Sequence, residues 1–215
     1  MKNIAIYGFG GFGKEVACIL RSINALSPTW DMIGFFDDGI PAGSESRYGK
    51  VLGGIETLNN YPSQLSVIMA IANPNVLEKL YLAITNTLIS FPNIIAPDIT
   101  FYDKASLQMG IGNIIIYGSR LSCDIKLGNF NICNSSTYIG HDVSIGDFNV
   151  FQPETRLSGG VTVGDKNFFG TRSTVVQYIK IGSNTHIGSG SIVLRKTQDG
   201  FLYYGNPAKK VEGYK

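Results

Sequence analysis

The stretch Ile139–Val150 reads IGHDVSIGDFNV, and its pattern decides the fold of the second half of the chain. An aliphatic, aromatic or cysteine residue recurs at every sixth position from Met109 to Val193, and glycine follows it in eight of the fifteen repeats. The fifth position of each repeat is small, β-branched or asparagine. Such a short repeat is typical of a solenoid, here a three-sided prism with one inward side chain per side. We therefore expect residues 109–198 to form five coils of three hexads, without insertions.

The hexads VGDKNF (163–168) and FGTRST (169–174), with those quoted above, resemble the hexapeptide-repeat acyltransferases. That resemblance implies a left-handed parallel β-helix. Three further segments, YGFGGFGKEV (7–16), GFFDDG (34–39) and YGNPAKKV (204–211), extend it over nearly the whole chain. With them, the sequence is similar to the bacterial sialic acid O-acetyltransferases and to the N-acetyltransferases of nucleotide-linked 4-amino sugars.

The first part of the chain has a different sequence pattern. Short apolar runs alternate with segments in which apolar residues recur at the spacing of a helix. The runs predict strands at residues 3–7, 32–36, 67–71 and 91–96, and helices at residues 14–22 and 75–87. This order indicates a Rossmann-like α/β domain built of βαβ units. We expect three parts: a nucleotide-sugar-binding domain at 1–97, the β-helix at 98–198, and a tail at 199–215 that the resemblance places over CoA.

The glycines Gly8, Gly10 and Gly13 form a G-x-G-x-x-G motif between the first strand and the first helix. Backbone N–H groups and a helix N-terminus at such a loop suit a pyrophosphate, and Asp37 or Asp38 at the next strand end suits a ribose hydroxyl. NAD and a nucleotide-linked sugar both have these groups, and a tight turn without any ligand is the third possibility. The acyltransferase-like coil favours the nucleotide-linked sugar.

The resemblance implies that the acceptor's nucleotide lies against Gly10, Gly11, Phe12, Asp37 and Asp38, with Asn73 close by. Family members commonly have a histidine where this chain has Phe12. A stacking or steric contact would then replace a polar one.

The chain has only two histidines, His141 and His186. His141 is the third residue of its hexad, where the chain leaves the inward position, so its ring should lie outside the prism. The adjacent Asp142 would orient the ring and fix its tautomer, which makes the pair a candidate general base. The family's His-Glu or His-Asp pair matches these positions, whereas we expect His186 to be a surface residue. A backbone N–H at a coil corner is the expected donor to the oxyanion.

The resemblance also implies a site for acetyl-CoA along the coil edge. The family's second histidine, near the thioester, corresponds to Val150 in this chain. The remaining positions implied for CoA are Gly159, Thr171, Lys180, Asn206 and Pro207.

Composition excludes several classes of partner. The formal charge of +2 and the pI near 8.3 come with scattered lysines and arginines, which argues against nucleic acid and anionic membranes. The three cysteines lack metal-ligand spacing, so no metal is expected. No apolar run is long enough for a signal peptide or a membrane span, and we expect a cytoplasmic protein.

Together these observations predict an acetyl-CoA-dependent N-acetyltransferase that acts on a UDP- or dTDP-linked 4-amino-4,6-dideoxy sugar. The product would enter a surface glycan such as the O-antigen of a lipopolysaccharide. The resemblance implies a homotrimer with sites between subunits. Alternatives are an O-acetyltransferase of sialic acid or another sugar, and a non-catalytic trimeric nucleotide-binding subunit. A nucleotide-dependent oxidoreductase and a γ-type carbonic anhydrase are disfavoured, the latter because it needs three histidines for zinc.

Overall fold

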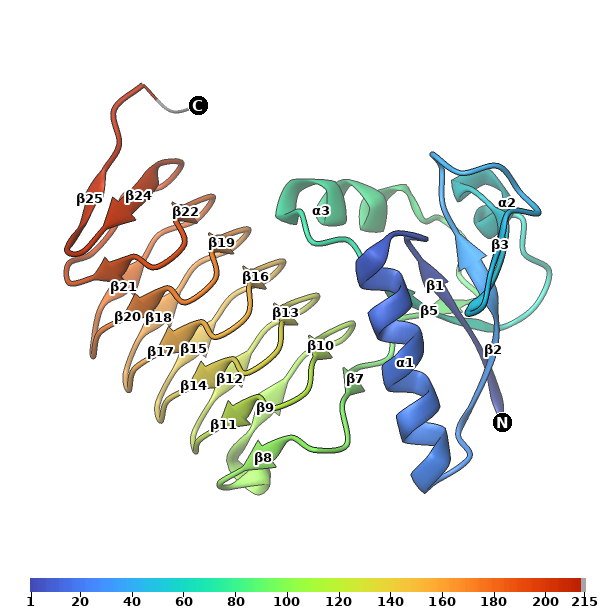
Figure 1. Ribbon diagram of the computed structural model, residues 1–215, viewed down its shortest axis with the longest axis horizontal. Coiled ribbons are helices and arrows are strands. Elements are labelled where there is room, and N and C mark those ends of the chain that lie inside the picture. The colour runs from blue at the N-terminus through green and yellow to red at the C-terminus, as the bar shows by residue number, and fades with distance from the viewer. Residues whose placement is uncertain (214–215) are drawn as a thin grey trace. The chain divides into compact units, whose positions relative to one another are not determined.

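The computed structural model describes residues 1–213 and divides into two compact units, Met1–Pro97 and Asp98–Lys215 (Figure 1). The last two residues of the predicted 199–215 tail, Tyr214 and Lys215, lie outside the described residues. No helix within residues 1–213 is long and apolar enough to cross a membrane.

The first unit is an α/β domain around one mainly parallel sheet. The strands of this sheet are β1 (Lys2–Tyr7), β2 (Trp30–Phe36), β3 (Glu45–Ser46), β4 (Gly49–Gly53), β5 (Leu65–Met69) and β6 (Ile89–Ser90). The short β7 (Ile94–Ile95) follows them in the chain and is not part of this sheet. Its helices are α1 (Gly11–Leu26), α2 (Ile55–Asn59) and α3 (Pro74–Ala83). The sheet order is β3-β4-β2-β1-β5-β6, and only the β3–β4 pair is antiparallel. The predicted Rossmann-like class is confirmed.

Strand β1 lies at the centre of this sheet, between β2 and β5, and its residues Ile4–Tyr7 are all buried. Helix α1 packs against it through an apolar stripe that includes Val16 and Leu20. Gly13 allows this close approach, because a Cβ at that position would collide with the carbonyl oxygen of Gly8. The third glycine of the motif is therefore required by helix–strand packing.

Several predicted elements differ from the observed ones. Helix α3 ends at Ala83 and not at residue 87, and β5 lies two residues before the predicted 67–71 strand. Helix α1 begins at Gly11 and ends at Leu26, so it is longer than the predicted 14–22 segment. The strand expected at 91–96 was wrong, since β6 ends at Ser90 and β7 covers only two residues. Pro92 lies between them and has no N–H to donate to a continuous ladder.

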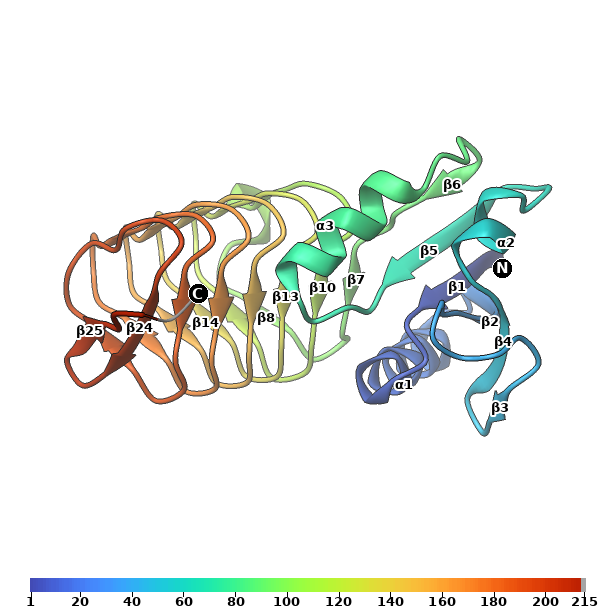
Figure 2. The same ribbon diagram turned by 90° about the horizontal axis from the view of Figure 1, so that it is seen from above.

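The second unit is a three-sided coil whose strands stack along one axis (Figures 1 and 2). The first face holds β10 (Ile114–Ile115), β13 (Ile132–Cys133), β16 (Val150–Phe151), β19 (Phe168–Phe169), β22 (His186–Ile187), β24 (Leu202–Gly205) and β25 (Ala208–Lys210). The second face holds β8 (Thr100–Phe101), β11 (Arg120–Leu121), β14 (Tyr138–Ile139), β17 (Arg156–Leu157), β20 (Thr174–Val175) and β23 (Ile192–Val193). The third face holds β9 (Gln108–Met109), β12 (Lys126–Leu127), β15 (Ser144–Ile145), β18 (Thr162–Val163) and β21 (Lys180–Ile181).

From β9 to β23, successive strands on a face are parallel and offset by 18 residues, as in the pair of Leu121 with Ile139. At the C-terminal end, β24 is parallel to β22 at an offset of 16 residues, and β25 is antiparallel to β24. The second residue of each strand points inward, so that Ile139, Phe151 and Leu157 are fully buried. The predicted left-handed β-helix is confirmed. The coil begins earlier than the predicted residue 109, because Thr100 of β8 pairs with Arg120 at an offset of 20 residues. The turn that contains the 3-10 helix Lys104–Ser106 has two extra residues. Strand β8 is therefore out of phase with the six-residue repeat and was not recognised from it.

Each corner of the coil repeats one kind of buried side chain. Serine and threonine occupy the corner between the first and second faces, and valine and isoleucine occupy most of the corner between the second and third. Asn113, Asn131, Asn149 and Asn167 stack in the third corner, all fully buried. The Oδ1 atom of Asn131 accepts hydrogen bonds from the backbone N–H and the side chain of Asn149, both at 3.0 Å. This asparagine ladder links successive coils.

The glycines after the inward residues have a different role from the predicted one. A glycine in such a repeat is expected to tolerate a tight backbone at the corner. Positive φ occurs instead two residues later and mostly at other residue types, such as Asp142 with φ 57°. The glycines are instead required by a lack of space. A Cβ on Gly146, for example, would collide with the carboxylate of Asp165 in the next coil.

Candidate active site

His141 lies at the corner between the second and third faces, just after β14. It lines a hollow of about 490 Å³ together with Tyr138, Ser158, Gly159, Val176 and Gln177. About 44% of the His141 side chain is exposed, in agreement with the expectation that the ring lies outside the prism. The hollow is therefore accessible to a substrate.

The imidazole of His141 is held from two sides. Its Nδ1 lies 2.7 Å from Oδ2 of Asp142, whose positive φ turns the carboxylate back toward the ring. With the carboxylate accepting, Nδ1 carries the proton and Nε2 is left as the proton acceptor. The ring lies over Gly159, eighteen residues later, where a Cβ would collide with Nε2 and lie 2.5 Å from Cε1. Only glycine leaves room for the ring in this position.

The backbone N–H of Gly159 is available beside this ring. Neighbouring amides are used, since Ser158 donates to Val175 at 3.0 Å and Gly160 donates to His141 at 2.8 Å. Within the described part of the chain, the N–H of Gly159 has no acceptor. A free N–H next to a base is the arrangement that stabilises a developing oxyanion.

The other residues predicted for CoA lie at separate places on the second unit. Thr171 and Lys180 are exposed on the coil, and Asn206 and Pro207 form the exposed turn of the β24–β25 hairpin. Val150 is fully buried in β16, and it does not line the hollow around His141. Gly159 lines the hollow, but all of the assignments to CoA, that of Gly159 included, stay predictions.

In the first unit, the residues predicted for the nucleotide follow three adjacent parallel strands. The glycine loop follows β1, Asp37 and Asp38 follow β2, and Asn73 follows β5 at the start of α3. The carboxyl ends of parallel strands are where α/β sheets bind ligands. The structure thus brings the loop and Asp37 together, since Oδ2 of Asp37 accepts from the Phe9 N–H at 2.8 Å.

Both carboxylates also have structural partners. Oδ1 of Asp37 accepts from the N–H of Gly39 at 2.8 Å. Asp38 accepts from the Tyr7 hydroxyl at 2.6 Å and from the N–H of Ile55, at the start of α2, at 2.8 Å. Burial and this hydrogen bond to Asp38 raise the pKa of Tyr7 well above its ordinary value, so the phenol stays protonated. Each carboxylate oxygen keeps a lone pair for a ligand hydroxyl.

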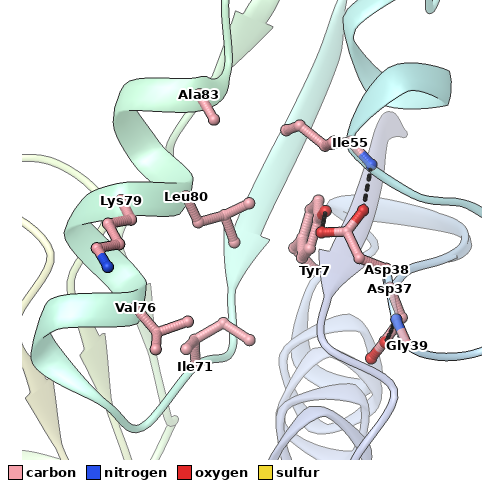
Figure 3. A pocket seen from close by; sticks show the side chains of 10 residues that line it. All are labelled: Tyr7, Asp37, Asp38, Gly39, Ile55, Ile71, Val76, Lys79, Leu80 and Ala83. Atoms are coloured by element: carbon pink, nitrogen blue, oxygen red, sulfur yellow. Dashed lines mark hydrogen bonds between the residues drawn. The ribbon is translucent and has the colours of Figure 1, made fainter.

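A cavity of about 370 Å³ opens beside Asp37 and Asp38, and Figure 3 shows side chains of α3 across from Tyr7. Most of its lining is apolar and comes from Ile55, Ile71, Val76, Leu80 and Ala83, with Lys79 also present. Gly10, Gly11, Phe12 and Asn73 do not line it. Gly10 and Gly11 are exposed, with open space around them, and the Asn73 side chain caps α3 by accepting from the N–H groups of Asn75 and Val76.

Sequence reasoning missed several lining residues. In the coil, adding or subtracting 18 from a residue number gives its neighbour in the adjacent coil, and this rule leads from His141 to Gly159 and Gln177. In the first unit, Tyr7 and Lys79 carried no comparable signal. Both line the cavity because of the order of the strands in the sheet, and this order cannot be read from the spacing of residues in the sequence.

The remaining titratable groups do not form a second catalytic cluster. His186 in β22 has its ring 4.7 Å from that of Phe168, and burial lowers its pKa. Burial raises the pKa of the Cys133 thiol to about 12, which makes it a core residue. Among residues 1–213, no group of three or more His, Cys, Asp and Glu side chains could hold a metal ion.

Comparison with known proteins gives matches to both units. Residues 3–84 match the model of the PglD N-terminal domain. No curated protein matches the chain. Many solved structures do match, and the three described next each cover 98% of the chain.

A mutant of perosamine N-acetyltransferase from Caulobacter crescentus, in complex with CoA and GDP-perosamine, is 25% identical, with a TM-score of 0.88 over 98% of this chain and 97% of that one. The acetyltransferase domain of PglB from Neisseria gonorrhoeae FA1090, in complex with acetyl coenzyme A, is 25% identical, with a TM-score of 0.87 over 98% and 99%. WeeI from Acinetobacter baumannii AYE is 27% identical, with a TM-score of 0.87 over 98% and 100%. A PglD N-terminal domain followed by a hexapeptide β-helix is the organisation of the PglD-type nucleotide-sugar N-acetyltransferases, and the chain resembles this family over both of its units.

Proposed function

We propose that the chain is an acetyl-CoA-dependent N-acetyltransferase of nucleotide-linked amino sugars, with a 4-amino-4,6-dideoxy sugar as acceptor in the making of a surface glycan. The observation that carries this proposal is the His141–Asp142 pair, with its free Nε2 beside the free N–H of Gly159 in an open hollow. Solved neighbours that hold CoA with GDP-perosamine, or acetyl coenzyme A, support the two substrates.

In the proposed reaction, Nε2 of His141 takes a proton from the sugar amine as its nitrogen attacks the thioester carbonyl carbon. A C–N bond forms, and the carbonyl oxygen becomes an oxyanion that accepts a hydrogen bond from the N–H of Gly159. The C–S bond then breaks, and the imidazolium returns the proton to the leaving thiolate. Asp142 stabilises the imidazolium in between. No metal and no covalent enzyme intermediate are needed for this balance.

We infer that the nucleotide of the acceptor binds at the carboxyl ends of β1, β2 and β5. The apolar cavity between Tyr7 and α3 suits a flat base, and the Asp37 and Asp38 carboxylates suit ribose hydroxyls. Gly10 and Gly11, which have open space around them, stay predicted contacts of the nucleotide.

Calorimetry on the full chain without CoA tests this part. We expect UDP, dTDP or GDP to bind, and Asp37→Asn to weaken the binding because one carboxylate oxygen becomes an amide. Asp31→Asn is the matched control, since Asp31 is exposed and lies near the start of β2, at the opposite end of the strand from Asp37. A failure of all three nucleotides to bind would contradict the assignment.

The acetyl transfer itself is tested by incubating the chain with acetyl-CoA and a panel of acceptors while free thiol is followed. The panel contains UDP-, dTDP- and GDP-linked amino sugars and free sialic acids. We expect thiol release with an amino-sugar nucleotide. If thiol is released only with sialic acid, O-acetylation replaces the proposal. If none of the acceptors gives thiol release, the result favours a non-catalytic nucleotide-binding subunit.

A further inference from the structure

The second face of the coil holds a cavity of about 310 Å³ that is separate from the hollow around His141. Arg120 of β11, Tyr138 of β14 and Arg156 of β17 line it, together with Glu154 from the preceding corner. None of these residues entered the sequence-based prediction. The cavity combines two cations with one aromatic hydroxyl, which is a composition suited to an anion.

The strand register determines how these side chains lie. Arg120 is aligned with Tyr138, and Tyr138 is aligned with Arg156. Aligned residues in parallel strands project from the same face, and neighbouring strands are about 4.8 Å apart. The two arginines therefore flank Tyr138 on one face, with their backbones about 10 Å apart. This spacing lets both guanidinium groups reach one ligand that lies over the tyrosine.

The charges of these arginines are not neutralised by neighbours. Among residues 1–213, neither Arg120 nor Arg156 has an ion-pair or hydrogen-bonding partner for its side chain. Glu154 lines the same cavity, but its Oε2 lies 2.8 Å from Nε of Arg172, outside the cavity. The guanidinium of Arg172 thus offsets part of the charge of Glu154, and the cavity with its two arginines keeps a net positive charge. Planar guanidinium groups suit phosphate oxygens, which they can bind in pairs.

Tyr138 connects this cavity to the reaction site, because it also lines the hollow around His141. In a nucleotide-linked sugar, the diphosphate is attached to the anomeric carbon, only a sugar ring away from an amine at C4. In acetyl-CoA, the whole pantetheine chain separates the thioester from the diphosphate. Since the cavity adjoins the catalytic histidine, the chemistry favours the diphosphate of the acceptor.

We propose that Arg120, Tyr138 and Arg156 form a diphosphate-binding site that holds the acceptor while its amine lies at His141. The assignment of the diphosphate to the acceptor rests on the proposed function, whereas the anion site itself stands on the arrangement of the arginines. Glu154 sets the strength of binding, because its carboxylate opposes the anion.

The first experiment measures binding of inorganic pyrophosphate to the full chain by calorimetry at low ionic strength. We expect Arg120→Gln and Arg156→Gln each to weaken it about 10-fold or more, since each removes a charge-assisted pair. Glu154→Gln should tighten it, because a negative charge is lost from the cavity. Lys126→Gln, which removes an exposed cation from the third face, is the matched control and should change nothing. Equal affinity in all variants would overturn the site.

The second experiment separates the two sources of diphosphate through steady-state kinetics. We expect the arginine variants to raise KM for the acceptor about 10-fold and to leave KM for acetyl-CoA unchanged. If the arginine variants raise only KM for acetyl-CoA, and weaken the binding of CoA more than that of UDP, the assignment to the acceptor is overturned. A change in molecular mass by light scattering with unchanged pyrophosphate binding would show that the arginines form a subunit contact, and would overturn the proposal.

The two experiments keep this inference distinct from the proposed function. Thiol release without any effect of the arginine variants on KM or pyrophosphate binding would refute only the diphosphate site. Arginine-dependent pyrophosphate binding without thiol release for any acceptor would refute only the acetyl transfer. If Arg120→Gln fails to fold, two other variants still test the site. Arg120→Lys should partly lower the affinity for pyrophosphate, and Glu154→Gln should raise it.

Discussion

His141 is oriented by a neighbour in sequence and by a neighbour in the next coil. Asp142 fixes the tautomer through Nδ1, and the bare backbone of Gly159 gives the ring a surface to lie on. These contacts leave Nε2 at the wall of the hollow, next to an amide N–H without an acceptor. The proposed catalytic geometry therefore depends on His141 and Gly159, which lie eighteen positions apart in the sequence.

His141→Asn should lower kcat by roughly 100-fold or more, because the proton of the attacking amine loses its acceptor. Affinity for the nucleotide should stay within about twofold, since His141 is not among the residues proposed to bind the nucleotide or its diphosphate. Steady-state thiol release and calorimetry with UDP measure the two quantities. Wild-type turnover in this variant would show that His141 is structural.

Gly159→Ala should displace the His141 ring and lower kcat by about 100-fold, since a misplacement of about 1 Å can have this effect. The collision is with a side chain that is partly exposed, so the variant should still fold. Gly164→Ala is the matched control. Its Cβ would lie 2.5 Å from Oγ of Ser183 and 2.8 Å from the backbone oxygen of Gly182, so this change is sterically the more severe, but it is at a corner that does not line the hollow. Equal turnover in the two variants would contradict the positioning role.

The asparagine ladder is the feature that ties one coil to the next. Each Oδ1 accepts from the next coil, so the amide of Asn149 has partners in the coils before and after it. Three of the ladder's backbone N–H groups lie where water has no access, and their only acceptors are these side chains. Buried groups of this kind contribute to stability because leaving them unpaired has a large cost.

Asn149→Ala should lower the free energy of unfolding by about 3 kcal/mol, because it leaves buried donors of Asn167 without their acceptor. Urea unfolding followed by circular dichroism measures this change. Thr162→Ala, on the exposed side of β18, should change the stability by less than about 0.5 kcal/mol. A similar midpoint for both variants would contradict the importance of the ladder.

The repeat made the coil predictable, since one inward residue per six fixes strand, corner and face. The positions of β8 and β24 were not predictable in this way, because the chain gains or loses two residues on either side of the regular hexads. The role of the hexad glycines also required the structure. Their lack of space comes from Asp147 and Asp165 in the following coils, and a local backbone argument does not include those neighbours.

At the scale of the whole molecule, the sequence contained the candidate base but not the full sites. His141 and Asp142 are adjacent and could be read as a pair. The cavity between Tyr7 and α3 joins residues from β1, β2, α2 and α3, and strand order alone brings them together. The sequence likewise did not identify Arg120 and Arg156 as a pair. The strand register shows that both are aligned with Tyr138, one on each side.

We expect the chain to form a trimer in solution. Large apolar side chains are exposed on the coil, with Tyr178 exposed by 74% and Leu194 by 46%, and packing of coils against each other would cover such surface. Light scattering should give three times the 23.3 kDa of one chain. A monomeric mass at micromolar concentration would contradict this expectation and would leave the hollow around His141 without a neighbouring subunit.

The most direct test of the central claim is the stoichiometry of acetyl transfer at saturating acetyl-CoA, with a nucleotide-linked 4-amino sugar as acceptor. We expect one free thiol for each acceptor molecule that gains the mass of one acetyl group, with the acetyl group bound to nitrogen. Thiol release and the gain in mass should both be lost in His141→Asn. Acetylation of a hydroxyl group, or transfer that continues unchanged without His141, would contradict it.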